Sequence, residues 1–136
     1  MPEGSQEAMN STLARLLRAI TEVDSSTIEE CCTSEVKLHV PGARDVDLTR
    51  RSQGSEALTV WAQTVHDLCG MTQFAMDRYF ENGCETMSVG MIDIERLPRR
   101  FSSPCAVHVR FEGSRIASFQ LLLDTYALER FRGGMD

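Results

Sequence analysis

The most constraining feature of the sequence is the segment 110–128, which predicts a β-hairpin followed by a short helix. Two runs rich in apolar and aromatic residues flank the turn-forming tripeptide Glu112-Gly113-Ser114, and this arrangement indicates a tight turn between antiparallel strands. The second run stops at Asp124, whose carboxylate can accept hydrogen bonds from the free N–H groups of a helix's first turn. We therefore expect structural roles for Gly113 in the turn and for Asp124 as a cap.

The residues before this hairpin predict helices and one short strand. Apolar residues three and four positions apart predict a first helix that begins at Asn10 or Ser11. A capping-box spacing of Ser26 and Glu29 predicts a short second helix, and apolar residues closed by Gly70 predict a third. The expected elements are helices over 10–23, 26–33 and 55–70 and a strand over 36–40, with a mobile flap over 43–54.

Four β-rich runs follow, over 72–80, 86–95, 105–111 and 116–123. Asn82-Gly83 is a strong signal for a two-residue hairpin turn between the first two runs, and we interpret 98–104 as a longer connection. Helices followed by a four-strand meander are an α+β order. We expect one domain over 10–132, with flexible tails over 1–9 and 133–136.

Composition excludes several classes of function. The 136 residues carry 14 Lys and Arg against 20 Asp and Glu, a net charge of −6, which disfavours nucleic acid because its binding depends on neutralising phosphates. No apolar run reaches the roughly 18 residues that span a bilayer. Five cysteines without a Cys-x-x-Cys pair fit a cytoplasmic protein with reduced thiols. The three histidines lack the spacing of metal ligands, so we expect no metal and no other cofactor.

The spacing of Gly113, Ile116 and Asp124 resembles the last hairpin of the nuclear-transport-factor-2-like superfamily, and of its SnoaL-like branch in particular. This branch includes polyketide cyclases and ketosteroid-isomerase-like proteins. The resemblance implies three N-terminal helices packed on a strongly curved mixed or antiparallel sheet, a cone-shaped α+β barrel that encloses an apolar pocket. It also implies a homodimer, because relatives commonly pair their sheets back to back.

Side chains alternate along a strand, so the wholly apolar set Phe119, Leu121 and Leu123 is the natural inner face of the last strand. The resemblance to enzymatic relatives would place a catalytic carboxylate at Leu121 and a histidine at Phe119. Apolar side chains at these positions cannot transfer a proton. Aromatic and methionine side chains complete the expected ligand pocket, namely Trp61, Phe74, Met87, Met91 and Phe101.

Three other side chains are candidates for catalysis. Asp93 is in phase with Met87 and Met91, so it either ends an apolar cavity as an acid–base group or stands in water at a strand end. His108 alternates with valines and is either a proton shuttle in the pocket or a polar partner on the outer face. His39 shares a strand face with Lys37, which favours exposure.

Three classes of function follow. The leading hypothesis is a protein that binds a small apolar or aromatic molecule in the cavity. The alternative is an isomerase, cyclase or epoxide-hydrolase-type enzyme that uses Asp93 with His108 or His39. The third is a protein-interaction module without catalysis. The fold alone does not decide among them, because function depends on the residues of the site.

Overall fold

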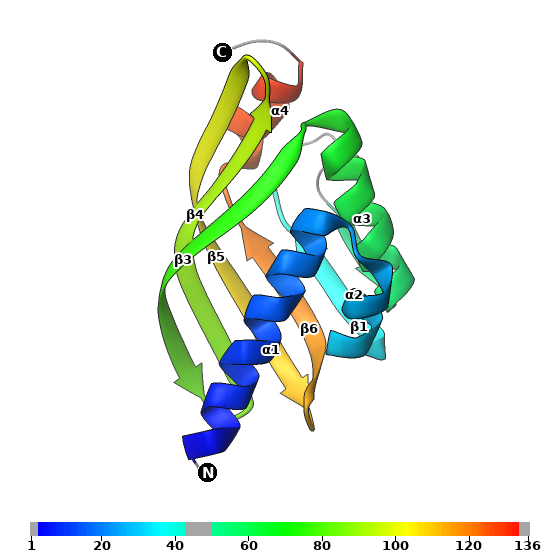
Figure 1. Cartoon of the computed structure of the whole chain (residues 1–136), viewed down its shortest axis with the longest axis vertical. Coiled ribbons are helices and arrows are strands. Elements are labelled where there is room, and N and C mark those ends of the chain that lie inside the picture. The colour runs from blue at the N-terminus through cyan, green and yellow to red at the C-terminus, as the bar shows by residue number, and fades with distance from the viewer. Residues whose placement is uncertain (1–2, 43–49, 134–136) are drawn as a thin grey trace.

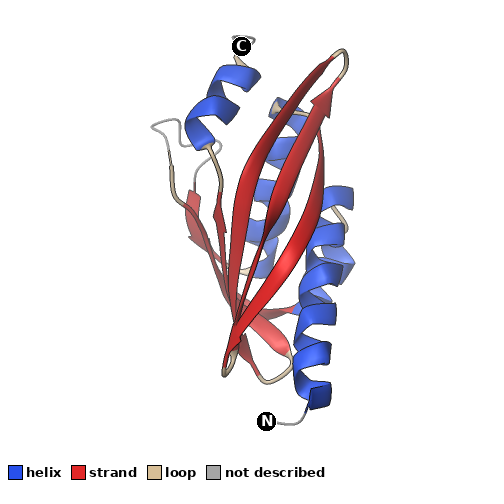
Figure 2. Cartoon of the chain, turned by 90° about the vertical axis from the view of Figure 1, so that its left-hand side faces the viewer, coloured by secondary structure: helices blue, strands red, loops and turns tan. Residues whose placement is uncertain are grey.

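The computed structural model describes residues 3–42 and 50–133. Helices α1, α2 and α3 pack on one face of a strongly twisted sheet, and α4 lies near the turn that joins β4 to β5 (Figures 1 and 2). In chain order the elements are α1 (Glu3–Glu22), α2 (Ser25–Cys31), β1 (Cys32–Val40), β2 (Arg50–Gln53), α3 (Ser55–Leu68), β3 (Met71–Asn82), β4 (Glu85–Arg96), β5 (Arg99–Glu112), β6 (Arg115–Leu122) and α4 (Thr125–Arg132).

The sheet is mixed and open. Its strand order is β2-β1-β6-β5-β4-β3; β1 and β6 run parallel, and all other neighbours are antiparallel. The α+β class, with three N-terminal helices on a curved mixed sheet, is therefore confirmed. Strand β2 lies inside the segment predicted to be an irregular flap and pairs with β1, whereas 43–49 lie outside the described residues.

Helix α1 begins at Glu3, so the predicted start at Asn10 or Ser11 is wrong. The polar and small residues before Asn10 include good helix formers such as Glu7 and Ala8. Met9 is buried and extends the apolar stripe of the helix by one turn. The first part of α1 was therefore not predicted, because only one side of the helix is buried and most of its residues are polar.

Helix α2 is capped by Asp24, two residues before the Ser26 of the predicted capping box. The Asp24 carboxylate accepts hydrogen bonds from the Thr27 hydroxyl at 2.7 Å and from the Thr27 N–H at 3.2 Å. These bonds to the charged form lower the pKa of Asp24. The chain reverses just before this cap at Val23, a non-glycine residue with a φ of 51°.

Both predicted hairpin turns and the closing helix are confirmed. Gly83 and Gly113 each have a φ of 64°, a conformation that glycine adopts without steric cost. The Asp124 carboxylate accepts a hydrogen bond from the Ala127 N–H at 2.9 Å and so caps α4.

The connection predicted over 98–104 is wrong, because β5 begins at Arg99 and pairs with β4 throughout this segment. Pro104 suggested a break, since proline cannot donate a ladder hydrogen bond. It is tolerated because the pairing of β5 with β6 extends only as far as Ala106 opposite Leu122, which leaves Pro104 beyond the end of that ladder.

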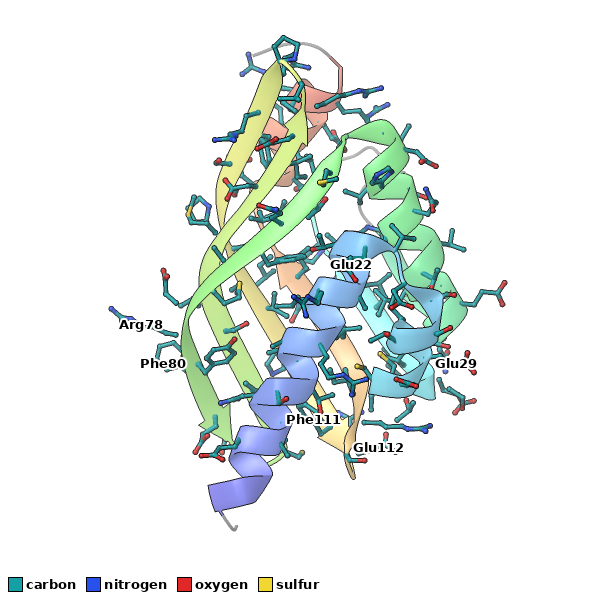
Figure 3. The ribbon with its side chains drawn as sticks, in the orientation of Figure 1. Glu22, Glu29, Arg78, Phe80, Phe111 and Glu112 are labelled. Carbon is teal, nitrogen blue, oxygen red and sulfur yellow. The ribbon has the colours of Figure 1, made fainter. Side chains whose placement is uncertain are left out.

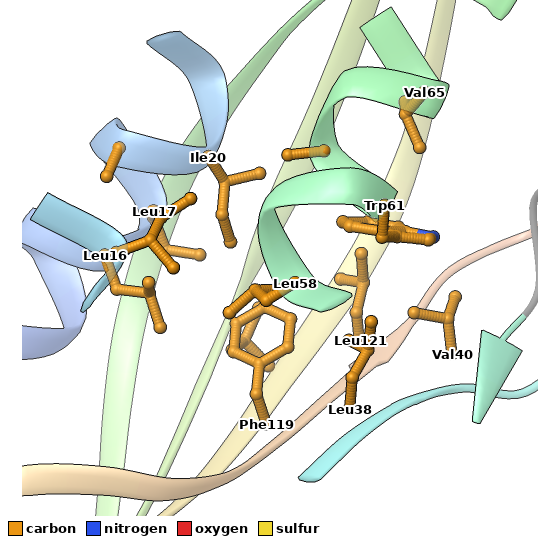
Figure 4. Close-up of a cluster of buried hydrophobic side chains, with 14 of the residues drawn as sticks. Leu16, Leu17, Ile20, Leu38, Val40, Leu58, Trp61, Val65, Phe119 and Leu121 are labelled. Carbon is orange, nitrogen blue, oxygen red and sulfur yellow. The ribbon is translucent and has the colours of Figure 1, made fainter. Parts of the chain in front are cut away.

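The core fills the space between the concave face of the sheet and the helices (Figure 4). Leu16, Leu17 and Ile20 of α1 and Leu58, Trp61 and Val65 of α3 pack onto Leu38, Val40, Phe119 and Leu121 of β1 and β6. The sheet bends where an extra residue interrupts the pairing of β3 with β4, between Met76 and Arg78. Gly90 lies opposite Met76, and the bend depends on its missing side chain.

The hydroxyls of Thr86 and Ser88 are buried on the inner face of β4 and have no hydrogen-bond partner among the residues that the structure describes. Replacing Thr86 with valine keeps the shape and removes the unpaired group, so we expect the free energy of unfolding to rise by about 1 kcal/mol. Urea denaturation measures this change. The matched substitution Thr27→Val removes a hydroxyl that donates to Asp24 and should lower stability by about 1 kcal/mol. If both substitutions lower the stability, the Thr86 hydroxyl has a hydrogen-bond partner and the assignment of an unpaired group is contradicted.

Candidate ligand cavity

A cavity lies between α1, α3 and the concave face of the sheet, at the end where α4 follows β6. Twelve residues line it, and nine of them are apolar: Ile20, Trp61, Ala62, Val65, Ile92, Ile94, Leu121, Leu123 and Leu128. Most of these side chains are buried, with Ile94 and Leu121 fully inaccessible to solvent. The lining is therefore suited to an apolar molecule.

The three polar residues of the lining are Thr21, His66 and Thr72. They come from the C-terminal end of α1, the C-terminal end of α3 and the start of β3. The end of α3 and the start of β3 lie toward the end of the molecule that carries α4, and α1 ends nearer the middle (Figure 1). His66 is exposed and Thr21 half-buried, whereas Thr72 is buried. A ligand would therefore meet polar groups at one end of the cavity and apolar side chains beyond it.

The cavity is narrow. It encloses about 420 Å³ between its atoms, but only about 10 Å³ of it is open to the centre of a water molecule, roughly what one water requires. A larger molecule fits only if lining side chains such as Trp61 and Leu123 move apart.

A wider groove adjoins the cavity along the seam between α1 and β3. It has about 420 Å³ open to water and meets the cavity at Thr21, which lines both spaces. Its lining is mixed: Leu17, Phe74 and Met76 are apolar, whereas Arg18, Glu22, Gln73 and Tyr79 offer charged or hydrogen-bonding groups.

The predicted pocket residues divide into four groups. Trp61, Leu121 and Leu123 line the cavity, and Phe74 lines the adjoining groove. Phe119 is fully buried in the core beneath them. Phe101 is also buried, and its ring lies 5.7 Å from that of Phe131 in α4.

Met87 and Met91, which make up the fourth group, lie on the outer face of the sheet, so their assignment to the pocket is wrong. Strand β4 directs Ile92 and Ile94 into the cavity, and the alternation of side chains places Met91 and Asp93 on the other face. The alternation of apolar and polar residues along β4 did not show which face is buried, because the inner face also carries the polar residues Thr86 and Ser88.

The predicted catalytic residues Asp93, His108 and His39 also lie on the outer face, away from the cavity. Asp93 accepts a hydrogen bond from the Ser102 hydroxyl of β5. His108 Nε2 lies 2.8 Å from Glu85 Oε1, and His39 Nδ1 lies 3.3 Å from Gln120 Nε2. Each group has a cross-strand polar partner, so none can act on a molecule in the cavity.

The outer face carries an apolar patch among these polar groups. Ala106 lies between Val89 of β4 and Leu122 of β6, and Met91 and Leu122 are 37% and 38% exposed. Phe80 and Arg78 point away from the helices at the edge of this face, whereas Phe111 lies under α1 (Figure 3).

Four of the five cysteines are buried, and Cys84 is exposed. Cys31 and Cys32 are buried, and burial raises the pKa of the Cys32 thiol to about 12, so it is not ionised at neutral pH. Burial also raises the pKa of Cys105 to about 11, with a smaller contribution from Asp93. Within 3–42 and 50–133, no group of three or more His, Cys, Asp or Glu side chains could hold a metal ion.

Sequence reasoning missed Thr21, His66 and Thr72 as cavity residues and Arg18 as a groove residue. His66 follows Trp61 by five positions and precedes Asp67, which indicated the wet side of the helix. In the structure His66 is exposed to solvent and also lines the cavity, because its imidazole lies at the rim. The direction in which α3 crosses the sheet brings His66 to the cavity, and the periodicity of the sequence does not predict that direction.

No protein-family model matches the sequence, and no curated protein matches it. Solved structures do match. An NTF2-like protein of unknown function from Burkholderia pseudomallei superposes with a TM-score of 0.79 at 18% identity, over 91% of this chain and 96% of that one. This chain has the nuclear-transport-factor-2-like fold.

Two other structural neighbours have names that suggest chemistry. A putative SnoaL-like polyketide cyclase from Jannaschia sp. CCS1 has a TM-score of 0.78 at 8% identity, covering 96% of this chain and 94% of that one. An LEH-like epoxide hydrolase from M. tuberculosis has a TM-score of 0.72 at 14% identity, covering 95% and 91%. The TM-scores establish a shared fold, and one fold can host different chemistries. No helix in the described ranges is long and apolar enough to cross a membrane.

Proposed function

We propose that this NTF2-like protein binds a small apolar or aromatic molecule in the cavity between α1, α3 and the sheet. The observation that carries the proposal is the lining: nine of twelve residues are apolar, and none is a carboxylate. Trp61, Ala62 and Leu121 provide apolar surface at the centre of the lining, and burial of such surface is the main source of affinity for an apolar ligand.

The single tryptophan of the chain provides the test, because Trp61 lines the cavity. We expect titration with 1-decanol below its solubility limit to change the intensity or wavelength of Trp61 emission in a saturable way. Ala62→Phe should abolish the change, because its ring takes the space that opens when the lining side chains move apart. Val60→Phe adds the same ring on the exposed side of α3 and should preserve the change. Absence of a saturable change in the unmodified protein would refute apolar binding in the cavity.

An enzyme is the second candidate, and it rests on a different residue from those predicted. His66 lines the cavity beside Thr72, and its Nδ1 lies 3.6 Å from Asp67 Oδ1. An imidazole that contacts a bound molecule can act as a general base. The binding hypothesis ranks first because His66 is the one imidazole, and no carboxylate accompanies it, among the described residues that line the cavity.

The outer face of the sheet supports a homodimer. Val89, Ala106 and Leu122 lie side by side at its centre, and an apolar patch with a polar rim is typical of contacts between subunits. The polar side chains of His39, Gln120 and His108 lie side by side in the next row of outward-facing residues. We assign this face to contact with a second copy of the chain.

A cytoplasmic location completes the proposal. The five cysteines are free thiols, four of them buried and Cys84 exposed. A protein with an exposed thiol and no disulfide is suited to a reducing compartment.

A further inference from the structure

The groove along α1 and β3 extends the cavity toward solvent. On α1 the spacing of Ala14, Leu17, Arg18 and Thr21 places these four side chains on one face of the helix, and all four line the groove. On β3 the inner-face residues Thr72, Phe74 and Met76 lead from the cavity into the groove. Thr21 and Thr72 therefore mark the end of the cavity at which the groove begins.

The groove is lined by the charged residues Arg18 and Glu22, whereas the cavity lining contains no Asp, Glu, Lys or Arg. Arg18 is exposed and makes no hydrogen bond or ion pair with the residues that the structure describes. The hydroxyl-bearing Tyr79 lines the same groove and is 40% exposed. The second charge is Glu22, one turn after Arg18 at the end of α1 (Figure 3).

We propose that the ligand is an elongated amphiphile whose apolar end occupies the cavity and whose carboxylate lies in the groove against Arg18. This inference rests on the proposed function of the cavity and adds the chemical class of the ligand. A guanidinium holds a carboxylate through two parallel N–H···O bonds, and Leu17, Phe74 and Met76 give the chain between the two ends an apolar path.

Glu22 repels an anion and so modulates the affinity for it. Its carboxylate lies on the same groove as Arg18, at the end nearer the cavity. Glu22→Gln should therefore raise the affinity for a carboxylate by about two- to threefold, since an exposed charge is partly screened by water and salt. It should leave the affinity for an uncharged ligand unchanged.

The test compares decanoate with 1-decanol, which share an alkyl chain, by Trp61 emission. We expect decanoate to bind about tenfold more tightly than 1-decanol, and Arg18→Gln to remove this advantage while changing 1-decanol affinity less than twofold. Arg15→Gln is the matched control, because Arg15 lies outside the groove and pairs with Glu30 at 2.9 Å. It should leave both affinities unchanged.

The outcomes separate the two levels of the proposal. If 1-decanol binds but decanoate binds no better, or if Arg18→Gln weakens both ligands equally, the Arg18 site is refuted and apolar binding in the cavity stands. If neither ligand binds, both proposals fail.

Discussion

Replacing Gly90 with alanine is expected to lower the free energy of unfolding by about 3 kcal/mol. A Cβ atom at Gly90 would lie 2.2 Å from the Ala75 carbonyl oxygen and 2.6 Å from the Met76 Cα. Both are backbone atoms, so no rotamer change relieves the contact. Strand β3 would have to move away from β4 at the interruption in their pairing, where the sheet bends.

Gly83→Ala is the matched control for this prediction. Gly83 has a φ of 64° but open space around its Cβ position, so the substitution should cost only about 1 kcal/mol for the left-handed backbone conformation. Urea denaturation of both variants measures the difference. Equal destabilisation would show that close packing at Gly90 does not limit the bend. Because the bend shapes the wall of the groove, Gly90→Ala should also weaken ligand binding in the protein that remains folded.

The sequence predicted the fold well wherever its signals are local. Gly83, Gly113 and Asp124 fix two turns and one cap through their own backbone and side-chain chemistry, and all three were predicted. The start of α1 and the first half of β5 were not. In both segments the decisive contacts are tertiary: Met9 is buried against the core, and Phe101 packs on Phe131 of α4.

The site was predicted less well, because the sequence does not show which face of a strand is inside. On β6 one face is wholly apolar, and Phe119 and Leu121 were correctly placed inside. On β4 the outer residues Met87 and Met91 are more apolar than the inner residues Thr86 and Ser88. When both faces of a sheet carry apolar residues, the hydrophobic pattern does not show which face is buried. For this reason the sequence left two positions open for Asp93, at one end of the cavity or in water at a strand end.

The apolar patch on the outer face of the sheet gives the second large prediction. Ala106→Glu is expected to raise the dissociation constant of the proposed homodimer on the order of 100-fold, because a carboxylate buried without a partner costs several kcal/mol. Ala106 lies between Val89 and Leu122, so the charge falls at the centre of the patch. Sedimentation equilibrium over a range of protein concentrations measures the dissociation constant.

Val60→Glu is the matched control, because Val60 is 46% exposed on α3, on the helical side of the molecule. It should leave the dissociation constant unchanged. A monomer at all concentrations for the unmodified protein would refute the homodimer, and a dimer that tolerates Ala106→Glu would place the contact elsewhere. If Ala106→Glu yields a folded monomer that binds 1-decanol with unchanged affinity, each subunit carries a complete cavity. That result would agree with the geometry, because the residues lining the cavity and those of the outer patch lie on opposite faces of the sheet.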